Sequence, residues 1–255
     1  MGKKVIITAG PTNERIDSVM KITNMATGSF GKVMAEELWR PGIDTIYYLS
    51  PKLAAKPSVA SSTRQIKCIE IESAEDLLAE LTKLLTTEHI DAVIHSAAVG
   101  DYKAKYSIRA EDPVSEIVER QAEEGRMLDY DELMEIFDSP RTVNDDSGKM
   151  SSYEPHLMTM MTLTPKVIGH IKKLSPDTVL VGFKLLDGVP KEELLRVARN
   201  LQMKNDADYI VANDLSLMKD GRYQATVIGK YGFEFDCSSK KELAQVIRHR
   251  LEERW

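Results

Sequence analysis

The stretch Lys4-Val5-Ile6-Ile7-Thr8-Ala9-Gly10 decides the fold class of this chain. It is short, rich in β-branched residues and stopped by Gly10-Pro11, which is typical of a buried strand that ends in a turn. Residues 31–39 have helical spacing and stop at Pro41-Gly42, and residues 44–49 repeat the strand pattern. A strand, a helix and a second strand in this order predict a parallel βαβ unit.

The alternation of strands and helices continues along the chain. Further strands are expected at 66–71, 91–99, 178–183 and 209–214, with helices at 74–85 and 191–203. Capping boxes are expected at Ser73-x-x-Asp76 and at Ser239-x-x-Glu242, and the second would open an amphipathic helix that reaches Trp255. The sequence therefore predicts an α/β fold with a Rossmann-like, doubly wound, mostly parallel sheet flanked by helices.

Two segments depart from this alternation. Residues 222–236 form two alternating runs around a glycine-containing turn, which predicts an appended β-hairpin. Such a hairpin often leaves a sheet edge that a second subunit covers, so a homodimer is expected. Residues 105–148 are acidic with helical spacing, and we interpret them as an insertion or flap within a single domain of residues 1–255.

The charge distribution limits the possible partners. The chain has 34 Lys and Arg against 40 Asp and Glu, a net charge of -6, and the segment Glu111 to Asp146 alone carries -10. The remainder is mildly basic, which suits a small anionic ligand but not nucleic acid, because a phosphate backbone needs clustered Lys and Arg. No apolar run is long enough for a membrane span and no signal peptide is recognisable, so a cytoplasmic protein is expected.

A ligand site is expected at the carboxyl ends of the strands. The segment from Asn24 to Lys32 places Gly28 and Gly31 at the start of a helix, where backbone amides can face an anion. The same segment is also compatible with an ordinary glycine-rich loop. Neither GxxxxGK[ST] nor GxGxxG is present, so typical P-loop and standard dinucleotide sites are not expected.

Other polar residues follow strands. Asp101 and Asn213-Asp214 either bind a ligand group or cap their own loops. The five histidines show neither HxxxH nor HExxH spacing, and Cys68 and Cys237 form no CxxC pair, so a metal site built by the protein is not expected.

Six segments in this order resemble phosphopantothenoylcysteine synthetase, also called phosphopantothenate-cysteine ligase, of coenzyme A biosynthesis. Three are similar to the family motifs ITxGGT with a nearby LD, N-x-S-S-G-x-x-G and AAVxDY: residues 7–17, 22–31 and 95–102. The other three are residues 149–152, 181–184 and 211–214. Because the flavin-dependent decarboxylase half of many bacterial members is absent, the monofunctional bacterial form is expected.

The resemblance implies a two-step amide ligation. A nucleoside triphosphate, CTP in most bacteria and ATP in eukaryotes, activates the carboxylate of 4'-phosphopantothenate as an acyl-nucleotide, here an acyl-cytidylate, and releases pyrophosphate. The amine of cysteine then displaces the nucleotide monophosphate. Mg²⁺ bound through the nucleotide phosphates would screen their charge with few protein ligands.

The resemblance also implies roles for individual residues. It assigns catalytic roles to Asn24 and Lys149. It assigns nucleotide binding to Gly10, Gly28, Gly31, Ser96, Asp101, Lys149, Phe183, Lys204 and Asn213, and substrate binding to Asn24, Ala97, Ala98 and Asp101. Without the family, Asn24 is interpreted as a turn residue, Phe183 as a core residue and Lys149 as part of a surface ion pair.

Departures from the family pattern leave the nucleotide open. Ala26-Thr27 replaces the usual Ser-Ser, Lys204 is one residue out of step, and Phe183-Lys184-Leu185 is closer to the eukaryotic form. The ATP-dependent ligation is therefore the alternative. A short-chain reductase is a remote alternative that would need TGxxxGxG and a Tyr-x-x-x-Lys on a later helix. A non-catalytic nucleotide-binding protein is another, but it would lose Asn24 or Lys149, and this chain has both.

Overall fold

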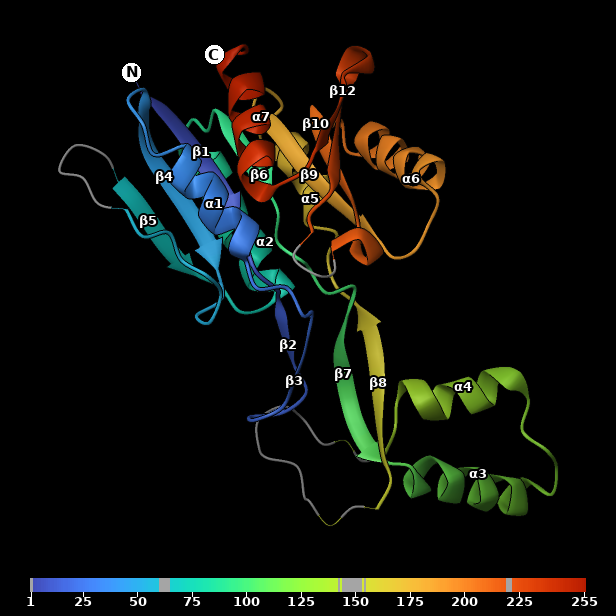
Figure 1. The fold of residues 1–255 in the computed structure, drawn as a ribbon. Helices are drawn as coiled ribbons and strands as arrows, with labels where there is room; N and C mark the ends of the chain where they lie inside the picture. Colours follow the sequence, from blue (N-terminus) through green and yellow to red (C-terminus); the bar gives the residue numbers. More distant parts are fainter. Residues whose placement is uncertain (1, 60–64, 142, 144–152, 154, 219–221) are drawn as a thin grey trace. The chain divides into compact units, whose positions relative to one another are not determined.

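The structure is a computed structural model that describes residues 2–59, 65–141, 143, 153, 155–218 and 222–255 (Figure 1). The chain forms two compact units. The first comprises Met1–Thr12, Asn24–Val99 and Pro165–Trp255, and the second comprises Asn13–Thr23 and Gly100–Thr164.

The first unit is built on an eight-stranded sheet in the order β12-β11-β10-β9-β6-β1-β4-β5. The strands are β1 Lys3–Thr8, β4 Ile43–Ser50, β5 Gln65–Glu70, β6 Ala92–His95, β9 Val179–Leu186, β10 Tyr209–Asp214, β11 Ala225–Gly229 and β12 Glu234–Cys237. The six neighbouring strands β5, β4, β1, β6, β9 and β10 are parallel, and β11 and β12 add an antiparallel edge. When these six strands are numbered by their order in the chain, they lie across the sheet in the order 3-2-1-4-5-6, which is the Rossmann arrangement. The predicted fold class is therefore confirmed.

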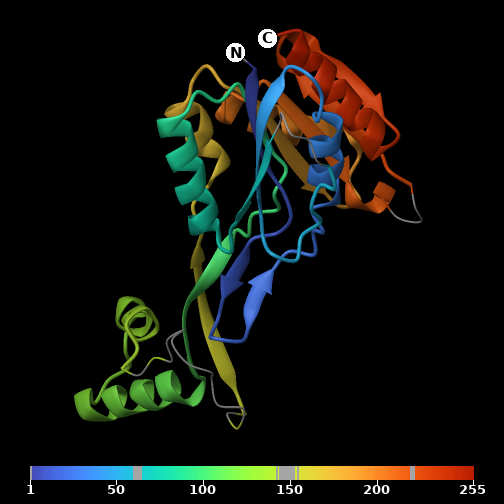
Figure 2. The same ribbon diagram turned by 90° about the vertical axis from the view of Figure 1, so that its left-hand side faces the viewer.

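Helices cover both faces of this sheet, as Figure 2 shows. One face packs against α1 Ser29–Glu37 and α7 Lys240–Glu252, and the other packs against α2 Ala74–Thr87, α5 Ile168–Leu174 and α6 Lys191–Lys204. Alternate residues of a strand serve the two cores, because Val5 and Ile7 face the α1 side whereas Ile6 faces the α2 side.

The predicted capping box of α2 is confirmed. Ser73 Oγ accepts the Asp76 amide at 3.1 Å, and the Asp76 carboxylate accepts the Ser73 amide at 2.9 Å. The box predicted at α7 is wrong in one half. Ser239 Oγ accepts the Glu242 amide, but the Glu242 carboxylate bonds the amide of Ser238 rather than that of the cap residue. The helix also ends at Glu252, before Trp255.

The hairpin predicted at 222–236 is confirmed. β11 and β12 pair antiparallel, and the short 3-10 helix η2 Lys230–Gly232 joins them. A second 3-10 helix, η1 Leu215–Met218, follows β10. β12 consequently forms one edge of the sheet, and β5 forms the other.

The second unit contains two antiparallel pairs and two helices. β2 Asn13–Arg15 pairs with β3 Lys21–Thr23, and β7 Tyr102–Arg109 pairs with β8 Leu157–Leu163. The helices α3 Glu111–Glu124 and α4 Tyr130–Asp138 lie within the acidic stretch expected at 105–148. The unit also takes in 13–23 and β8, which the sequence pattern did not indicate. Among the described residues, no helix has the length and apolar character that crossing a membrane requires.

Candidate functional site

The strand order of the first unit reverses between β1 and β6. These two strands are parallel neighbours, with Thr8 opposite His95 at their carboxyl ends. In an open α/β sheet, ligands bind in the crevice outside the carboxyl ends at such a reversal. The candidate site is therefore the edge where β1 and β6 end, here called the switch edge.

The segments that leave β1 and β6 stay side by side beyond the sheet. Ser96 Oγ donates to the Thr8 carbonyl at 2.7 Å, and the Ala97 amide donates to Thr8 Oγ1 at 3.2 Å. The Ala98 amide then donates to the Gly10 carbonyl at 2.9 Å. The predicted residues Gly10, Ser96, Ala97 and Ala98 are thus brought together by backbone and hydroxyl bonds.

Asn24 joins this group through its side chain. Its amide Nδ2 donates to the Ala98 carbonyl at 2.9 Å, across 74 positions of sequence. The same carbonyl accepts the Thr12 amide at 3.2 Å. The bond fixes how the exposed Asn24 amide is oriented, so this residue connects the N-x-x-x-G-x-x-G segment to the AAVxDY segment.

Three glycines allow the loops at this edge to touch. Gly10 has φ 78°, and a Cβ added there would lie 2.7 Å from Ala54 Cβ. Gly28 has φ 75°, and its added Cβ would lie 3.1 Å from the Gly10 amide nitrogen. Gly31 would place a Cβ 2.4 Å from Ala9 Cβ. The glycines are therefore needed for the packing of three loops, whether or not an anion also approaches their backbone.

Two features near these loops favour an anion. α1 begins after Gly28 without a side-chain cap and without an acidic residue in its first turn, so its N-terminal amides favour an anion. The loop after β4 carries Lys56, whose ammonium donates to Ser50 Oγ and to the Pro51 carbonyl. Within the described part of the chain, this lysine pairs with no carboxylate.

Phe183 lies in the second half of β9 and Asn213 near the carboxyl end of β10, both on the α1 side of the sheet. The Phe183 ring packs on Phe30 with centroids 5.0 Å apart. Asn213 is buried, and its amide donates to Tyr223 Oη at 3.3 Å and to the Gln224 carbonyl at 3.4 Å. Both side chains therefore have structural contacts at the position expected for nucleotide contacts.

Three further predicted site residues are not part of the group described above. Lys204 is the exposed last residue of α6, and a helix that connects parallel strands ends at the opposite edge of the sheet. Asp101 belongs to the second unit, where its carbonyl accepts the Thr164 amide at 3.0 Å. Lys149 lies outside the described residues.

His95 is a residue of the switch edge that the sequence analysis missed. It is 6% exposed, and its Nδ1 lies 2.9 Å from Thr8 Oγ1. Burial lowers the pKa of His95 to about 4, so the ring is neutral at pH 7. Its place at the end of a buried strand was a usable signal, whereas histidine spacing was not.

Asp214 has a structural explanation. Its carboxylate accepts the amides of Gly188, Val189 and Ser216 together with the Ser216 hydroxyl. The Gly188 amide is the largest cause that lowers the pKa of this carboxyl to about 2. Asp214 therefore anchors the loops after β9 and β10.

Among the described residues, no group of three His, Cys, Asp or Glu side chains is arranged to hold a metal ion.

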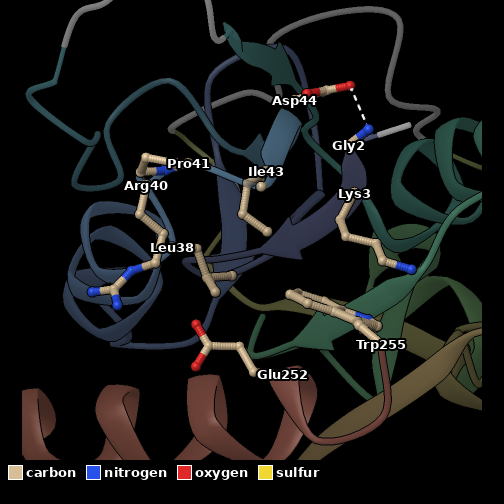
Figure 3. Close-up of a pocket in the computed structure, with 10 residues that line it drawn as sticks. Gly2, Lys3, Leu38, Arg40, Pro41, Ile43, Asp44, Glu252 and Trp255 are labelled. Atoms are coloured by element: carbon tan, nitrogen blue, oxygen red, sulfur yellow. Dashed lines mark hydrogen bonds between the residues drawn. The ribbon is translucent and has the colours of Figure 1, made fainter.

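A cavity of about 590 Å³ lies at the opposite edge of the sheet, at the start of β1 and β4 (Figure 3). Its charged walls already have partners: Arg40 bonds Glu37, Asp44 accepts the Gly2 amide, and Lys3 bonds Asp91. It shares no residue with the switch edge.

The family model of the "DNA/pantothenate metabolism flavoprotein C-terminal domain" matches residues 1–111 and 139–254. The chain belongs to this family. The resemblance inferred from the six sequence segments is thereby confirmed, and the part left unmatched, 112–138, holds most of α3 and all of α4.

Relatives and solved structures agree with this assignment. The chain is 28% identical over 252 residues to the coenzyme A biosynthesis bifunctional protein CoaBC of Thermococcus kodakarensis, covering 98% of this chain and 51% of the relative. It therefore spans about half the length of this family member. A structure of the DNA/pantothenate metabolism flavoprotein from Streptococcus pneumoniae matches with a TM-score of 0.79 and 30% identity over 99% of both chains. A Cab2 H337A complex with phosphopantothenate-cysteine, 13% identical with a TM-score of 0.66 over 99% of this chain and 87% of that one, shares the fold.

Proposed function

We propose that this protein is a phosphopantothenate-cysteine ligase of coenzyme A biosynthesis, joining 4'-phosphopantothenate to cysteine through an acyl-nucleotide. The observation that carries the proposal is the bond from the Asn24 amide to the Ala98 carbonyl beside Gly10. It brings three separate family motifs to the switch edge. The relatives' role in coenzyme A biosynthesis supports the same reaction.

The proposed reaction has two steps. A carboxylate oxygen of phosphopantothenate attacks the α-phosphorus of the nucleotide, a P–O bond forms, and the bond to pyrophosphate breaks. The cysteine amine then attacks the acyl carbon, and the nucleotide monophosphate leaves with the former carboxylate oxygen. Both reactants of the first step are anions, so the step needs positive groups that are in place before the reaction.

The switch edge supplies such groups. The N-terminal amides of α1 and the backbone near Gly10 and Gly28 are suited to phosphate oxygens, because a glycine backbone permits close approach. Asn24, oriented by Ala98, would donate to the acyl group during the attack by cysteine. Mg²⁺ held through the nucleotide phosphates would screen their charge.

We further propose CTP as the nucleotide, a homodimeric assembly and a cytoplasmic location. Asn213-Asp214-Leu215-Ser216 at the end of β10 and Lys149 follow the bacterial pattern, against the eukaryotic-like Phe183-Lys184-Leu185. In the family, two subunits associate so that each site borrows residues from its neighbour, which motivates the dimer.

The test compares CTP and ATP at equal concentration with Mg²⁺, phosphopantothenate and cysteine, and measures pyrophosphate. We expect release that depends on phosphopantothenate and is faster with CTP. A clear ATP preference would make the ATP-dependent ligation correct. Nucleotide binding without any pyrophosphate release would favour a non-catalytic nucleotide-binding protein instead.

A further inference from the structure

We propose that Lys240, the first residue of α7, is a further phosphate-binding residue of the switch edge. With Ser29 it would hold the pyrophosphate portion of the nucleoside triphosphate at the start of α1. The inference rests on the proposed function and adds to it a residue that none of the family motifs in the sequence includes.

Lys240 is held at this place by the packing of two helices. Its ammonium donates to Ser29 Oγ at 2.8 Å across 211 positions of sequence. Eight residues further along both helices, Arg248 Nε donates to Glu37 Oε1 at 2.8 Å, again across 211 positions. The equal offset shows that α1 and α7 run parallel, as they do in Figure 1, so that their N-terminal ends lie together.

The electrostatics of the two bonds differ. Arg248 pairs with the carboxylates of Glu37 and Glu252. Lys240 contacts a neutral hydroxyl and has no carboxylate partner among the residues that the structure describes. The acidic residue in the first turn of α7, Glu242, is directed to the amide and hydroxyl of Ser238.

The charges around Lys240 favour an anion at this position. The N-terminus of a helix carries a partial positive charge, and α1 has no acidic residue in its first turn to balance it. An ammonium placed there adds like charge, whereas a phosphate would be attracted by the ammonium and by the helix amides together.

The hydrogen-bond roles leave room for a phosphate oxygen. An ammonium only donates, so Ser29 Oγ accepts from Lys240 and keeps its own hydrogen to donate. The Ser29 amide donates to Thr27 Oγ1 at 3.4 Å, so the Thr27 hydroxyl belongs to the same loop.

Lys240 also borders the residues expected to contact the nucleotide. Its Nζ lies 5.8 Å from the centre of the Tyr223 ring, and Tyr223 Oη accepts from Asn213. Phe30, next to Ser29, packs on Phe183. The lysine thus lies on the α1 side of the proposed site, within the first unit.

The experiment uses the full chain with Lys240→Gln and Lys240→Arg, and Lys241→Gln as a matched control. Lys241 is the exposed neighbour on the same helix. Binding of inorganic pyrophosphate with Mg²⁺ is measured by calorimetry, and KM is measured separately for the nucleotide and for phosphopantothenate. Circular dichroism confirms that each variant is folded.

For Lys240→Gln we expect about 10- to 100-fold weaker pyrophosphate binding and a similar rise in the nucleotide KM, with the phosphopantothenate KM unchanged. Lys240→Arg should recover part of the loss, and Lys241→Gln should match the wild type. Equal losses in Lys240→Gln and Lys241→Gln, an effect on the phosphopantothenate KM alone, or no binding of pyrophosphate by the wild type would overturn the inference.

Two outcomes separate the inference from the proposed function. If the wild type binds pyrophosphate, Lys240→Gln does not, and no ligation occurs with either nucleotide, the inference stands and the proposed ligation is wrong. If ligation occurs and Lys240→Gln keeps the wild-type nucleotide KM, the proposed function stands and Lys240 has only a packing role.

Discussion

Asn24 shows how one side chain can be tested at the switch edge. Its amide donates to the Ala98 carbonyl, and an aspartate of nearly the same shape would face that carbonyl with a second acceptor. For Asn24→Asp we expect activation to continue while breakdown of the acyl-nucleotide slows by about 10²- to 10³-fold, because a donor to the developing oxyanion is lost. Rapid-quench analysis with labelled nucleotide should show the acyl-nucleotide accumulating.

Asn205→Asp is a matched control for this variant. The Asn205 amide also donates to a backbone carbonyl, that of Leu201 at 2.8 Å, but at the end of α6 rather than at the switch edge. It should turn over like the wild type. Wild-type turnover of Asn24→Asp would reduce Asn24 to a turn residue, and loss of both steps in a folded protein would move its role to substrate binding or activation.

The buried His95 predicts a pH dependence of stability. Its pKa is about 4 in the folded protein and about 6.5 when the chain is unfolded, so between these values the unfolded chain binds the additional proton. The free energy of unfolding should therefore fall as the pH drops from about 6.5 to 4, by about 3 kcal/mol in total from this residue.

The measurement is urea unfolding of the wild type and of His95→Gln across this pH range. The glutamine cannot titrate, so the difference between the two curves isolates the histidine. His89→Gln is the control, because the His89 side chain is 81% exposed. Parallel curves for the wild type and His95→Gln would show that the buried ring titrates as it does in water.

The loops after β1 and β4 and before α1 form one packed element at the switch edge. Gly10→Ala would combine a strained φ with a contact 2.7 Å from Ala54 Cβ, whereas Gly42→Ala has a similar φ with nothing within 4 Å. We expect Gly42→Ala to cost about 1 kcal/mol in unfolding free energy and Gly10→Ala about 2 to 4 kcal/mol. Urea unfolding of both variants measures the difference, and equal losses would mean that the loops yield to the added methyl group.

The elements predicted from sequence were those with a strong periodic signal. The strands β1, β4 and β10 were predictable because buried parallel strands are apolar along their length. The capping box of α2 was predictable from its residue spacing. The second unit was harder. β8 reads Leu-Met-Thr-Met-Met-Thr-Leu without alternation, and β2 and β3 have three residues each. Their pairing depends on contacts distant in sequence, which a local pattern does not contain.

The candidate site was predictable where motif and topology agree. Gly10, Ser96 and Ala98 follow strands that end at the order reversal, so the motifs and the strand order assign them to the same edge of the sheet. Lys204 shows the limit, since a motif gives the order of residues but not the edge of the sheet that a helix end reaches. Lys240 shows the converse, because parallel packing of α1 and α7 unites residues that share no motif.

The association of whole molecules is the last property that the fold makes testable. β12 is an edge strand that pairs only with β11 in the described sheet, and Phe235 on it is 43% exposed. Its neighbours Glu234 and Asp236 pair with Arg199 and Lys191 of the same chain, which lowers the repulsion that two such edges would feel.

We expect a homodimer at micromolar concentration, and Phe235→Lys should weaken it by placing a charge at the paired edge. Sedimentation velocity measures the mass, with Met203→Lys, at an exposed site on α6, as the control. A dimer that survives Phe235→Lys would place the interface elsewhere, and a fully active wild-type monomer would contradict the dimer itself.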